Sequence, residues 1–234
     1  LAGEGIADSK WTKERKQQII DSRVLSTRLL FKAIKEQKAE VKNFISSSAV
    51  GYYGDRKDEI LTEDSEPGEG FLAKCCLLWE QAVDQGKKLG LRIVKIRTGF
   101  VLANGEGALP VLEKPIRFFV GAALSSGKQW IPWIHLNDIA NIYISAVEDE
   151  TYEGVYNGCA PYPVTNETLT KAIAKKIHRP VWPINVPEKV LEMILGQMST
   201  VTTISNNTTA QKLLNEEFQF EFTHLEDALN DLYK

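Results

Sequence analysis

The spacing of apolar and polar residues divides the first hundred positions into alternating helices and strands. From Thr12 to about Lys38, apolar side chains recur every three or four residues, which predicts a long amphipathic helix with Thr12 as its N-cap. The apolar runs Val41 to Ser47 and Leu91 to Arg97 predict buried strands, and Gly70 to Leu89 between them predicts a second helix. This order is typical of βα units, so the pattern predicts an α/β fold with a parallel sheet.

The second half of the chain carries shorter elements. After a Gly-rich turn at residues 104–107, the pattern predicts one short strand, Val155 to Asn157, among several helices. The expected helices run from Leu109 to about Phe119, from Asn137 to Glu148 and from Thr165 to Ile177, and three more open at Pro187, near Thr209 and after the capping box Thr223-x-x-Glu226. We therefore expect a mostly helical C-terminal region.

A polar loop joins the first strand to the second helix. Residues 51–70 are rich in Gly, Asp, Glu and Pro, which are typical of turns and loops. Its acidic side chains are expected to form a solvated lid or rim, and a metal site is the alternative interpretation. These side chains include Glu63, Asp64, Glu66 and Glu69.

Composition narrows the class of protein. Of the 234 residues, 43% are hydrophobic and 25% are charged, which is typical of a globular chain rather than a disordered one. Lys and Arg number 28 against 31 Asp and Glu, so the net charge of −3 offers no basis for binding nucleic acid or an anionic membrane. No apolar run approaches the roughly 18 to 20 residues of a membrane-spanning helix, so we expect no membrane partner.

The cysteines and histidines form no metal or disulfide pattern. Cys75, Cys76 and Cys159 cannot make a disulfide framework, and neither they nor the three histidines have metal-ligand spacing. We therefore expect no metal and a reduced, cytoplasmic setting, and no signal peptide is visible. His178 and His224 are expected at the surface.

Two strand ends and one histidine carry candidate chemistry. The run Ser46 to Gly54 begins with three hydroxyl side chains at the carboxyl end of a strand, where ligands of open α/β sheets bind; the alternative is a strand that turns polar as it surfaces. The second strand end, Arg97 to Val101, is a weaker signal. His135 has the pKa range of a general acid or base. We favour instead a histidine that fixes the turn before a helix capped by Asn137.

The chain holds no complete nucleotide-binding fingerprint. Gly3-x-Gly5 has no strand before it, and Gly105-x-Gly107 lacks the third glycine of Gly-x-Gly-x-x-Gly. A Walker-type Gly-Lys-Ser/Thr is also missing from the sequence. These motifs alone therefore identify no phosphate-binding loop.

Several longer motifs, taken in order, resemble one branch of a known superfamily. They are Leu1-Ala-Gly-Glu4, Trp11-Thr-x-x-Arg-Lys16, Ser22-Arg23, Ser48-Ala-Val-Gly-Tyr-Tyr-Gly54, Leu61-Thr-Glu-Asp-Ser65, Trp79-Glu80, Arg97-Thr-Gly-Phe-Val-Leu102, Trp133-Ile-His135 and Phe218-Gln-Phe220. Together they resemble the extended short-chain dehydrogenase/reductase superfamily, in its branch of epimerase family proteins. That branch is related to nucleotide-sugar epimerases and carries a C-terminal domain of unknown function.

The resemblance implies a Rossmann-like, doubly wound parallel sheet that binds NADP(H) or NAD(H), with a smaller, mostly helical C-terminal substrate region. We expect residues 1–107 to be the C-terminal part of the dinucleotide-binding domain and residues 108–234 to form the substrate region, interleaved with the sheet near 130–158. The Gly-rich turn for the pyrophosphate is expected ahead of Leu1. The sheet should then lack its first βαβαβ half, which would weaken dinucleotide binding and leave a sheet edge exposed.

Matched position by position, the resemblance also implies site residues. The implied cofactor-binding positions are Leu1, Ala2, Gly3, Gln18, Arg23, Ser46 and Val101. Among them, Gly3 belongs to a strand end that passes the cofactor ribose, Arg23 reaches the cofactor from the long helix, and Val101 lies beside the nicotinamide. Ser48 matches the active-site Ser or Thr that binds the reacting oxygen of the substrate.

The catalytic pair of the superfamily is missing. Its members use Tyr-x-x-x-Lys on the helix after the serine, with the tyrosine as acid and base. The corresponding helix begins Phe71-Leu-Ala-Lys-Cys-Cys76, so neither of two possible registers retains Tyr or Lys. The two registers are Phe71/Cys75 and Leu72/Cys76. We expect Tyr53 or Tyr52 to substitute as the acid.

Two functions stay open at this point. The first is an atypical NAD(P)-dependent oxidoreductase or epimerase-like enzyme acting on a small molecule, either a sugar nucleotide or a carbonyl compound. Ser48 would position the reacting oxygen, Tyr53 or Tyr52 would move the proton, and the nicotinamide would move the hydride. The alternative is a non-catalytic dinucleotide-binding scaffold or redox sensor. A homodimer is compatible with either.

Overall fold

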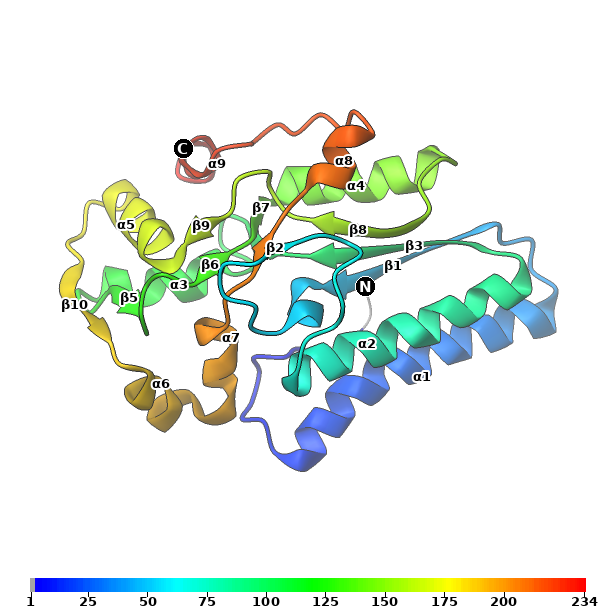
Figure 1. Cartoon of the computed structure of the whole chain (residues 1–234), viewed down its shortest axis with the longest axis horizontal. Coiled ribbons are helices and arrows are strands. Elements are labelled where there is room, and N and C mark those ends of the chain that lie inside the picture. Colours follow the sequence, from blue (N-terminus) through cyan, green and yellow to red (C-terminus); the bar gives the residue numbers. More distant parts are fainter. Residues whose placement is uncertain (1–2) are drawn as a thin grey trace.

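The computed structural model describes residues 3–234 and centres on a three-stranded parallel sheet (Figure 1). Its strands are β1 (Asn43–Ala49), β3 (Arg92–Thr98) and β8 (Gly154–Gly158), in the order β1-β3-β8. The register sets Ser48 beside Arg97, and Arg97 beside Asn157. Three polar side chains therefore form a row near the carboxyl ends of the strands, and the predicted α/β fold with a parallel sheet is confirmed.

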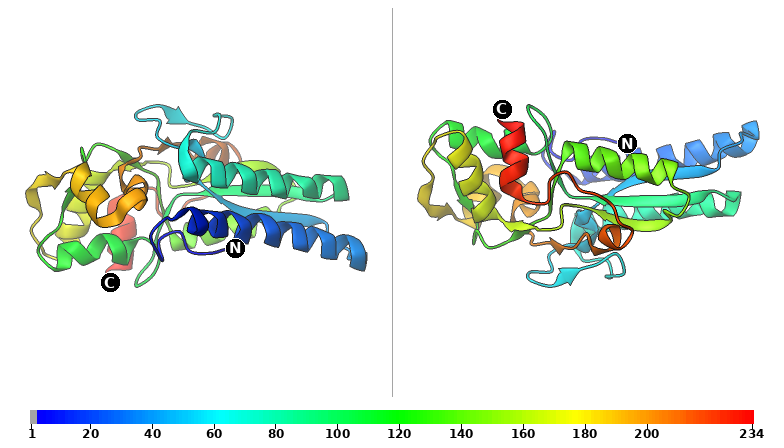
Figure 2. Two further views of the ribbon diagram at one scale, coloured as in Figure 1. Left: turned by 90° about the horizontal axis from the view of Figure 1, so that it is seen from below. Right: turned by 90° about the horizontal axis from the view of Figure 1, so that it is seen from above.

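Helices cover both faces of this sheet, as the two views of Figure 2 show. The helices α1 (Lys13–Gln37) and α2 (Gly70–Asp84) lie on one face, and α4 (Leu136–Glu148) lies on the other. The third element of the first face is the 3₁₀ helix η2 (Gln85–Leu89), which follows α2 directly. This arrangement buries both faces of the central strand, β3.

The apolar side chains of β3 pack against helices on both faces of the sheet, because successive side chains of a strand point to opposite faces. Ile96 packs with Ile142 of α4, whereas Ile93 packs with Val83 of α2. The same alternation sends Lys95 to the α2 side, where its ammonium contacts Asp84 at 2.8 Å. The α2 side of this apolar strand thus carries two charged side chains, Lys95 and Arg97.

The first helix, α1, has the capping chemistry that the sequence predicts. The Thr12 hydroxyl accepts a hydrogen bond from the Arg15 amide at 3.1 Å, and Lys38 ends the helix with a φ of 49°. The buried side of α1 is made by Ile19, Ile20, Val24, Thr27 and Phe31. The predicted helix and its N-cap are confirmed.

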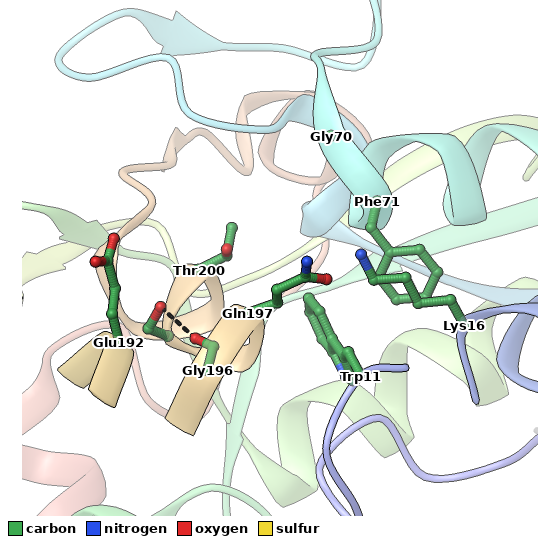
Figure 3. A pocket seen from close by; sticks show the side chains of 9 residues that line it. Trp11, Lys16, Gly70, Phe71, Glu192, Gly196, Gln197 and Thr200 are labelled. Atoms are coloured by element: carbon green, nitrogen blue, oxygen red, sulfur yellow. Dashed lines mark hydrogen bonds between the residues drawn. The ribbon is translucent and has the colours of Figure 1, made fainter. Parts of the chain in front are cut away.

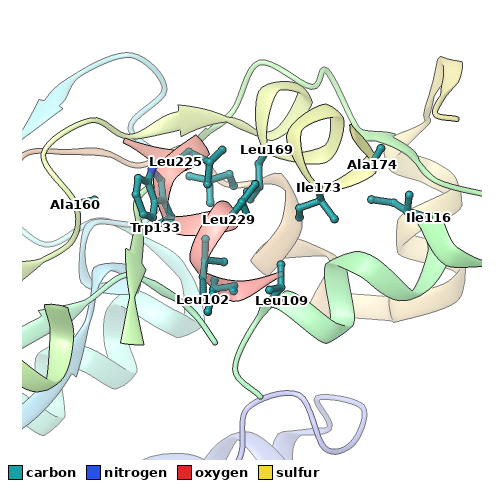
Figure 4. Close-up of a cluster of buried hydrophobic side chains, with 13 residues drawn as sticks. Leu102, Leu109, Ile116, Trp133, Ala160, Leu169, Ile173, Ala174, Leu225 and Leu229 are labelled. Carbon is teal, nitrogen blue, oxygen red and sulfur yellow. The ribbon is translucent and has the colours of Figure 1, made fainter. Parts of the chain in front are cut away.

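A second core lies beyond the sheet, among the helices of the C-terminal half (Figure 4). It is built by α3 (Leu109–Arg117), α5 (Asn166–Lys176) and α9 (Leu225–Leu232). Trp133 is fully buried there and packs with Leu169 and Leu229. Four two-stranded pairs edge this region: β4 (Phe100–Leu102) with β7 (Trp133–His135), β6 (Trp130–Ile131) with β9 (Val164–Thr165), β5 (Ala122–Leu124) with β10 (Trp182–Val186), and β2 (Ile60–Leu61) with β11 (Asn207–Thr208).

The three helices predicted near the C-terminus are present, together with two short helical elements that the pattern does not show. The predicted ones are α6 (Glu188–Leu195), α8 (Gln211–Asn215) and α9; the additional ones are the 3₁₀ helix η3 (Gly196–Ser199) and the one-turn helix α7 (Thr200–Thr203). The expected capping box does not form, because His224 is the N-cap of α9 and makes no side-chain capping bond. Among the described residues, no helix is long and apolar enough to cross a bilayer.

The polar loop after β1 is fastened to the C-terminal region. It follows the 3₁₀ helix η1 (Val50–Tyr53), and Asp55 Oδ1 accepts a hydrogen bond from the Ser205 amide at 3.1 Å. The Ser205 hydroxyl donates to the Lys57 carbonyl at 2.7 Å, and the Asn206 side chain donates to the Gly54 carbonyl. The β2–β11 pair extends this seam. The loop is therefore a fixed rim of the molecule.

Candidate functional site

Three buried side chains at the sheet and α2 form one hydrogen-bonded unit. The Ser48 hydroxyl donates to Glu80 Oε1 at 2.7 Å, and Arg97 donates to both Glu80 oxygens, at 2.9 Å from Nε and 3.1 Å from Nη2. Exposed fractions are 2% for Ser48, 5% for Glu80 and 3% for Arg97. The hydroxyl proton of Ser48 is thus committed to a carboxylate inside the protein.

The two candidate tyrosines belong to the same network. The Tyr53 hydroxyl donates to Asn157 Oδ1 at 2.6 Å and accepts from Arg97 Nη1 at 3.0 Å. Burial raises the pKa of Tyr53, and burial likewise raises the pKa of Tyr52. The Arg97 guanidinium carbon lies 3.4 Å from the centre of the Tyr52 ring. Both tyrosines are therefore held neutral around one cation.

The structure thus brings the predicted catalytic residues Ser48, Tyr52 and Tyr53 together around Arg97. Ser46 lies on the same face of β1, and its hydroxyl donates only to the Ser47 carbonyl, at 2.9 Å. The assignment of proton transfer to one of these hydroxyls stays a prediction.

The second predicted group lies at the start of α1. Leu1 and Ala2 are outside the described residues, whereas Gly3 lies against Arg23. Arg23 Nη1 donates to the Glu4 carbonyl at 3.1 Å and the Ile19 carbonyl at 3.0 Å. Arg15 adds a bond to the Gly5 carbonyl at 2.9 Å. Two arginines therefore pin this segment to the helix.

The Gly3–Arg23 pair fits part of a dinucleotide. A Cβ at Gly3 would come within 3.2 Å of the guanidinium carbon of Arg23, so bare backbone adjoins this cation. In residues 3–234, Nε and Nη2 of Arg23 have no hydrogen-bond acceptor, which leaves donors for a ribose hydroxyl or phosphate oxygen. These open donors fit the predicted role of Arg23 in cofactor binding, and that role stays a prediction.

Of two further predicted cofactor residues, Gln18 lies beside Arg15 on α1, and Val101 lies in β4. Gln18 is exposed on α1 and accepts a bond from Arg15 at 3.4 Å. Val101 is in β4, paired with Ile134, and its carbonyl accepts from the Ala108 amide at 3.0 Å. Among the described residues, no hydrogen bond links either of them to the Ser48 network.

His135 has a structural position. Its Nδ1 accepts a hydrogen bond from the Asn137 amide at 3.1 Å, so His135 itself caps α4. The interpretation that this histidine fixes the turn is confirmed, and the assignment of the cap to Asn137 is wrong. Asn137 lies inside the helix and its side chain contacts Glu221 at 3.1 Å. Burial lowers the pKa of His135.

An open cavity of about 480 Å³, which we call the α1–α6 cleft, lies between the start of α1 and α2 and the helices α6, η3 and α7 (Figure 3). One wall consists of Trp11, Lys16, Gly70 and Phe71, and the other consists of Glu192, Gly196, Gln197, Ser199 and Thr200. The Trp11 and Phe71 rings meet edge to face with centroids 4.8 Å apart. Its volume is in the range of small-molecule sites.

The two registers of the missing catalytic pair lie in the first turns of α2 and differ mainly in where their second members pack. Leu72 and Cys76 point toward η1, since a Cβ at Gly51 would lie 3.2 Å from the Cβ of Leu72 and 3.9 Å from the thiol of Cys76. Phe71 and Cys75 pack in the apolar cluster of α1, to which Leu72 also contributes. Gly70 and Phe71 in the first turn of α2 thus line the α1–α6 cleft, whereas Cys76, one turn later, packs with Tyr52 and Tyr53.

Sequence reasoning missed the role of Glu80 and the lining of the cleft. A signal for the first existed: Lys95 and Arg97 lie two apart on a strand, and Glu80 and Asp84 lie four apart on a helix, so each pair shares one face. The wall from α6 to α7 carries no comparable signal, because Gln197 and Thr200 belong to elements that the pattern does not show.

Sequence profiles of two families match the chain. The profile of the NAD dependent epimerase/dehydratase family matches residues 1–158, and the profile of a domain of unknown function, DUF1731, matches residues 186–232. The two walls of the α1–α6 cleft therefore come from the two matched parts.

Related proteins cover almost the whole chain. The epimerase family protein YfhF of Bacillus subtilis is 37% identical over 233 residues, which are 99% of this chain and 76% of that protein. The crystal structure of human epimerase family protein SDR39U1 with NADPH has a TM-score of 0.89 at 29% identity, covering 100% of this chain and 80% of that one. The crystal structure of a nucleoside-diphosphate sugar epimerase from Corynebacterium glutamicum has a TM-score of 0.78 at 33% identity. This match covers 96% of this chain and 44% of that one.

Proposed function

The chain belongs to the NAD dependent epimerase/dehydratase family, and we propose that it is an atypical NAD(P)-dependent oxidoreductase or epimerase-like enzyme. Its substrate would be a small molecule, such as a sugar nucleotide or a carbonyl compound, held in the α1–α6 cleft. The observation that carries the proposal is the position of this cleft at the first turn of α2, where Phe71 lines it. Superfamily members keep their catalytic tyrosine on this turn.

The cofactor would lie along the segment before α1. Gly3 supplies bare backbone and Arg23 supplies two open donors, and Leu1, Ala2, Ser46 and Val101 remain proposed cofactor positions. When bound, the nicotinamide would supply the acceptor or donor of a hydride. The related human structure with NADPH supports this cofactor class.

Within the proposal, the Ser48 network orders the carboxyl ends of β1 and β3. The Tyr53 hydroxyl already has two partners, so a proton leaves it only if the bond to Asn157 breaks. Tyr53 is therefore proposed mainly to position Arg97, and Ser48 and Tyr52 are the proposed groups nearest to the reacting atoms. Substitution of each residue distinguishes a positioning role from direct action on the reacting atoms.

The test follows nicotinamide absorbance while the purified protein meets a panel of sugar nucleotides and carbonyl compounds with NADPH or NADP⁺. We expect turnover with at least one compound. The Ser48→Ala, Tyr52→Phe double variant, which removes the two proposed groups nearest to the reacting atoms, should lower it by roughly 10²-fold or more, the scale of acid–base catalysis, at unchanged NADPH affinity. Lys13→Met, an exposed change on α1, is the matched control. Absence of turnover across the panel would contradict the enzyme proposal.

A second function has its own support. Ser48 is buried and its proton is bound by Glu80, and both registers on α2 lack Tyr and Lys. These features favour a non-catalytic dinucleotide-binding scaffold or redox sensor. In that case NADPH binds, no compound of the panel turns over, and the double variant changes neither result. A steep loss of measured turnover in the variant rules this function out.

A further inference from the structure

Lys16 is a half-buried cation in the wall of the α1–α6 cleft. Its ammonium lies 5.1 Å from the centre of the Phe71 ring and 5.9 Å from the centre of the Trp11 ring. Within residues 3–234, neither an ion-pair partner nor a hydrogen-bond acceptor meets this ammonium. A lysine carries three donors and no acceptor, so its donors remain for a ligand.

The opposite wall differs in chemistry. Figure 3 shows Gln197 and Thr200 on the C-terminal side of the cleft, with Glu192 at the end away from Lys16. The amide and hydroxyl bind polar substituents, and the Glu192 carboxylate repels an anion from its end. The charges of the cleft are thus polarised, positive beside the aromatic rings and negative across from them.

From this arrangement we infer that the cleft takes a small planar acid. Its carboxylate or phosphate would contact Lys16, its ring would lie against Trp11 and Phe71, and its polar substituents would face Gln197 and Thr200. A charged donor and an anion make a strong hydrogen bond, and aromatic faces add apolar contact area. The inference names the substrate class of the proposed cleft, and so rests on the proposed function.

The test uses three small probes that share one ring: phenyl phosphate, benzoate and benzyl alcohol. Binding to the protein is followed by the indole N–H signal of Trp11 in nuclear magnetic resonance spectra, identified by its loss in Trp11→Phe. At least one anionic probe should bind about tenfold or more tightly than the neutral alcohol. Comparison of phenyl phosphate with benzoate decides which anion the site prefers.

Substitutions assign the preference to one side chain. Lys16→Met keeps the alkyl stem and should abolish the anion preference, Lys16→Arg should restore it, and Lys13→Met on the exposed side of the same helix should leave it unchanged. Any of three results would overturn the inference. They are equal binding of the alcohol and the anions, an anion preference that persists in Lys16→Met, and probe binding that does not shift the indole N–H signal of Trp11.

A parallel titration with NADPH separates this inference from the proposed function. Lys16→Met should leave NADPH affinity unchanged while the affinity for the anionic probe falls. If both affinities fall together, Lys16 is a cofactor contact and the inference is overturned, while the cofactor proposal stands. If the parent protein binds the probes but not NADPH, the cofactor proposal fails and the anion site stands.

Discussion

Glu80 is the carboxylate that balances two cations in the interior. Its oxygens lie 2.9 Å from Arg97 Nε and 3.6 Å from Lys95 Nζ, and all three side chains are buried. We expect Glu80→Gln to lower the free energy of unfolding by about 3–5 kcal/mol, because Arg97 would stay buried with its partner charge removed. Denaturant unfolding measures this. In the control Glu36→Gln, which removes an exposed pair with Lys32, a loss under about 1 kcal/mol is expected; equal losses would contradict the account.

Tyr53 makes stability depend on pH in the alkaline range. Burial raises the pKa of Tyr53 in the folded protein above the value of about 10 in the unfolded chain. The unfolded chain releases this proton first, so the stabilisation is complete below about pH 10 and is lost as the pH rises further. The fall in unfolding free energy above that pH should be smaller in Tyr53→Phe. An unchanged slope would show that Tyr53 does not titrate in this way.

At the scale of elements, one hydroxyl group, that of Thr12, caps the N-terminus of α1. The Thr12 side chain is the only side-chain cap at this end in the described structure, and it binds the Arg15 amide. Thr12→Ala should cost about 1 kcal/mol, whereas Thr12→Asp should cost much less because Asp is also a good N-cap. Thermal unfolding of the two variants gives the comparison. Equal losses would assign the effect of Thr12→Ala to something other than the cap.

The elements that the sequence predicts well are those whose signals are local. The apolar spacing of α1 and its Thr12 cap depend only on neighbouring residues, so both were predictable. The end of α2 was not: the helical pattern continues to Leu89, but the structure changes to a 3₁₀ helix after Asp84. The cap of α4 was also assigned two residues too late, because His135 takes a role more common for Asn.

At the scale of the whole molecule, the C-terminal region holds the rim loop against the sheet domain. Asn206 is nearly inaccessible to solvent, and its amide donates to the Gly54 carbonyl across 152 positions of sequence. Asn206→Ala would leave that carbonyl without this donor, at a cost of about 1–3 kcal/mol. Amide hydrogen exchange of residues 54–69 should accelerate selectively. Uniform acceleration over the molecule would indicate global destabilisation instead.

The site could be predicted only in part. The Ser48–Arg97 row follows from the order of neighbouring strands, whereas the α1–α6 cleft is formed by residues far apart in the sequence. Ser48 and Arg97 end neighbouring parallel strands, and strand order follows from the βα pattern, so their meeting was foreseeable. Lys16 and Gln197 both line the α1–α6 cleft, and no local pattern predicts that residues so far apart in the sequence line one cavity. The catalytic assignment of Ser48, Tyr52 and Tyr53 remains a prediction, since the Ser48 and Tyr53 hydroxyls already donate to partners inside the protein.

The central claim is that this protein binds a nicotinamide dinucleotide through the segment pinned to α1. Calorimetric titration of NADPH and NADH into the purified protein and its Arg23→Met variant tests it most directly. We predict saturable binding of at least one dinucleotide and an affinity at least about tenfold lower in Arg23→Met, because the charge-assisted contacts are lost. Lys13→Met should bind like the parent. Failure of both dinucleotides to bind, or identical affinity in Arg23→Met, would contradict the account.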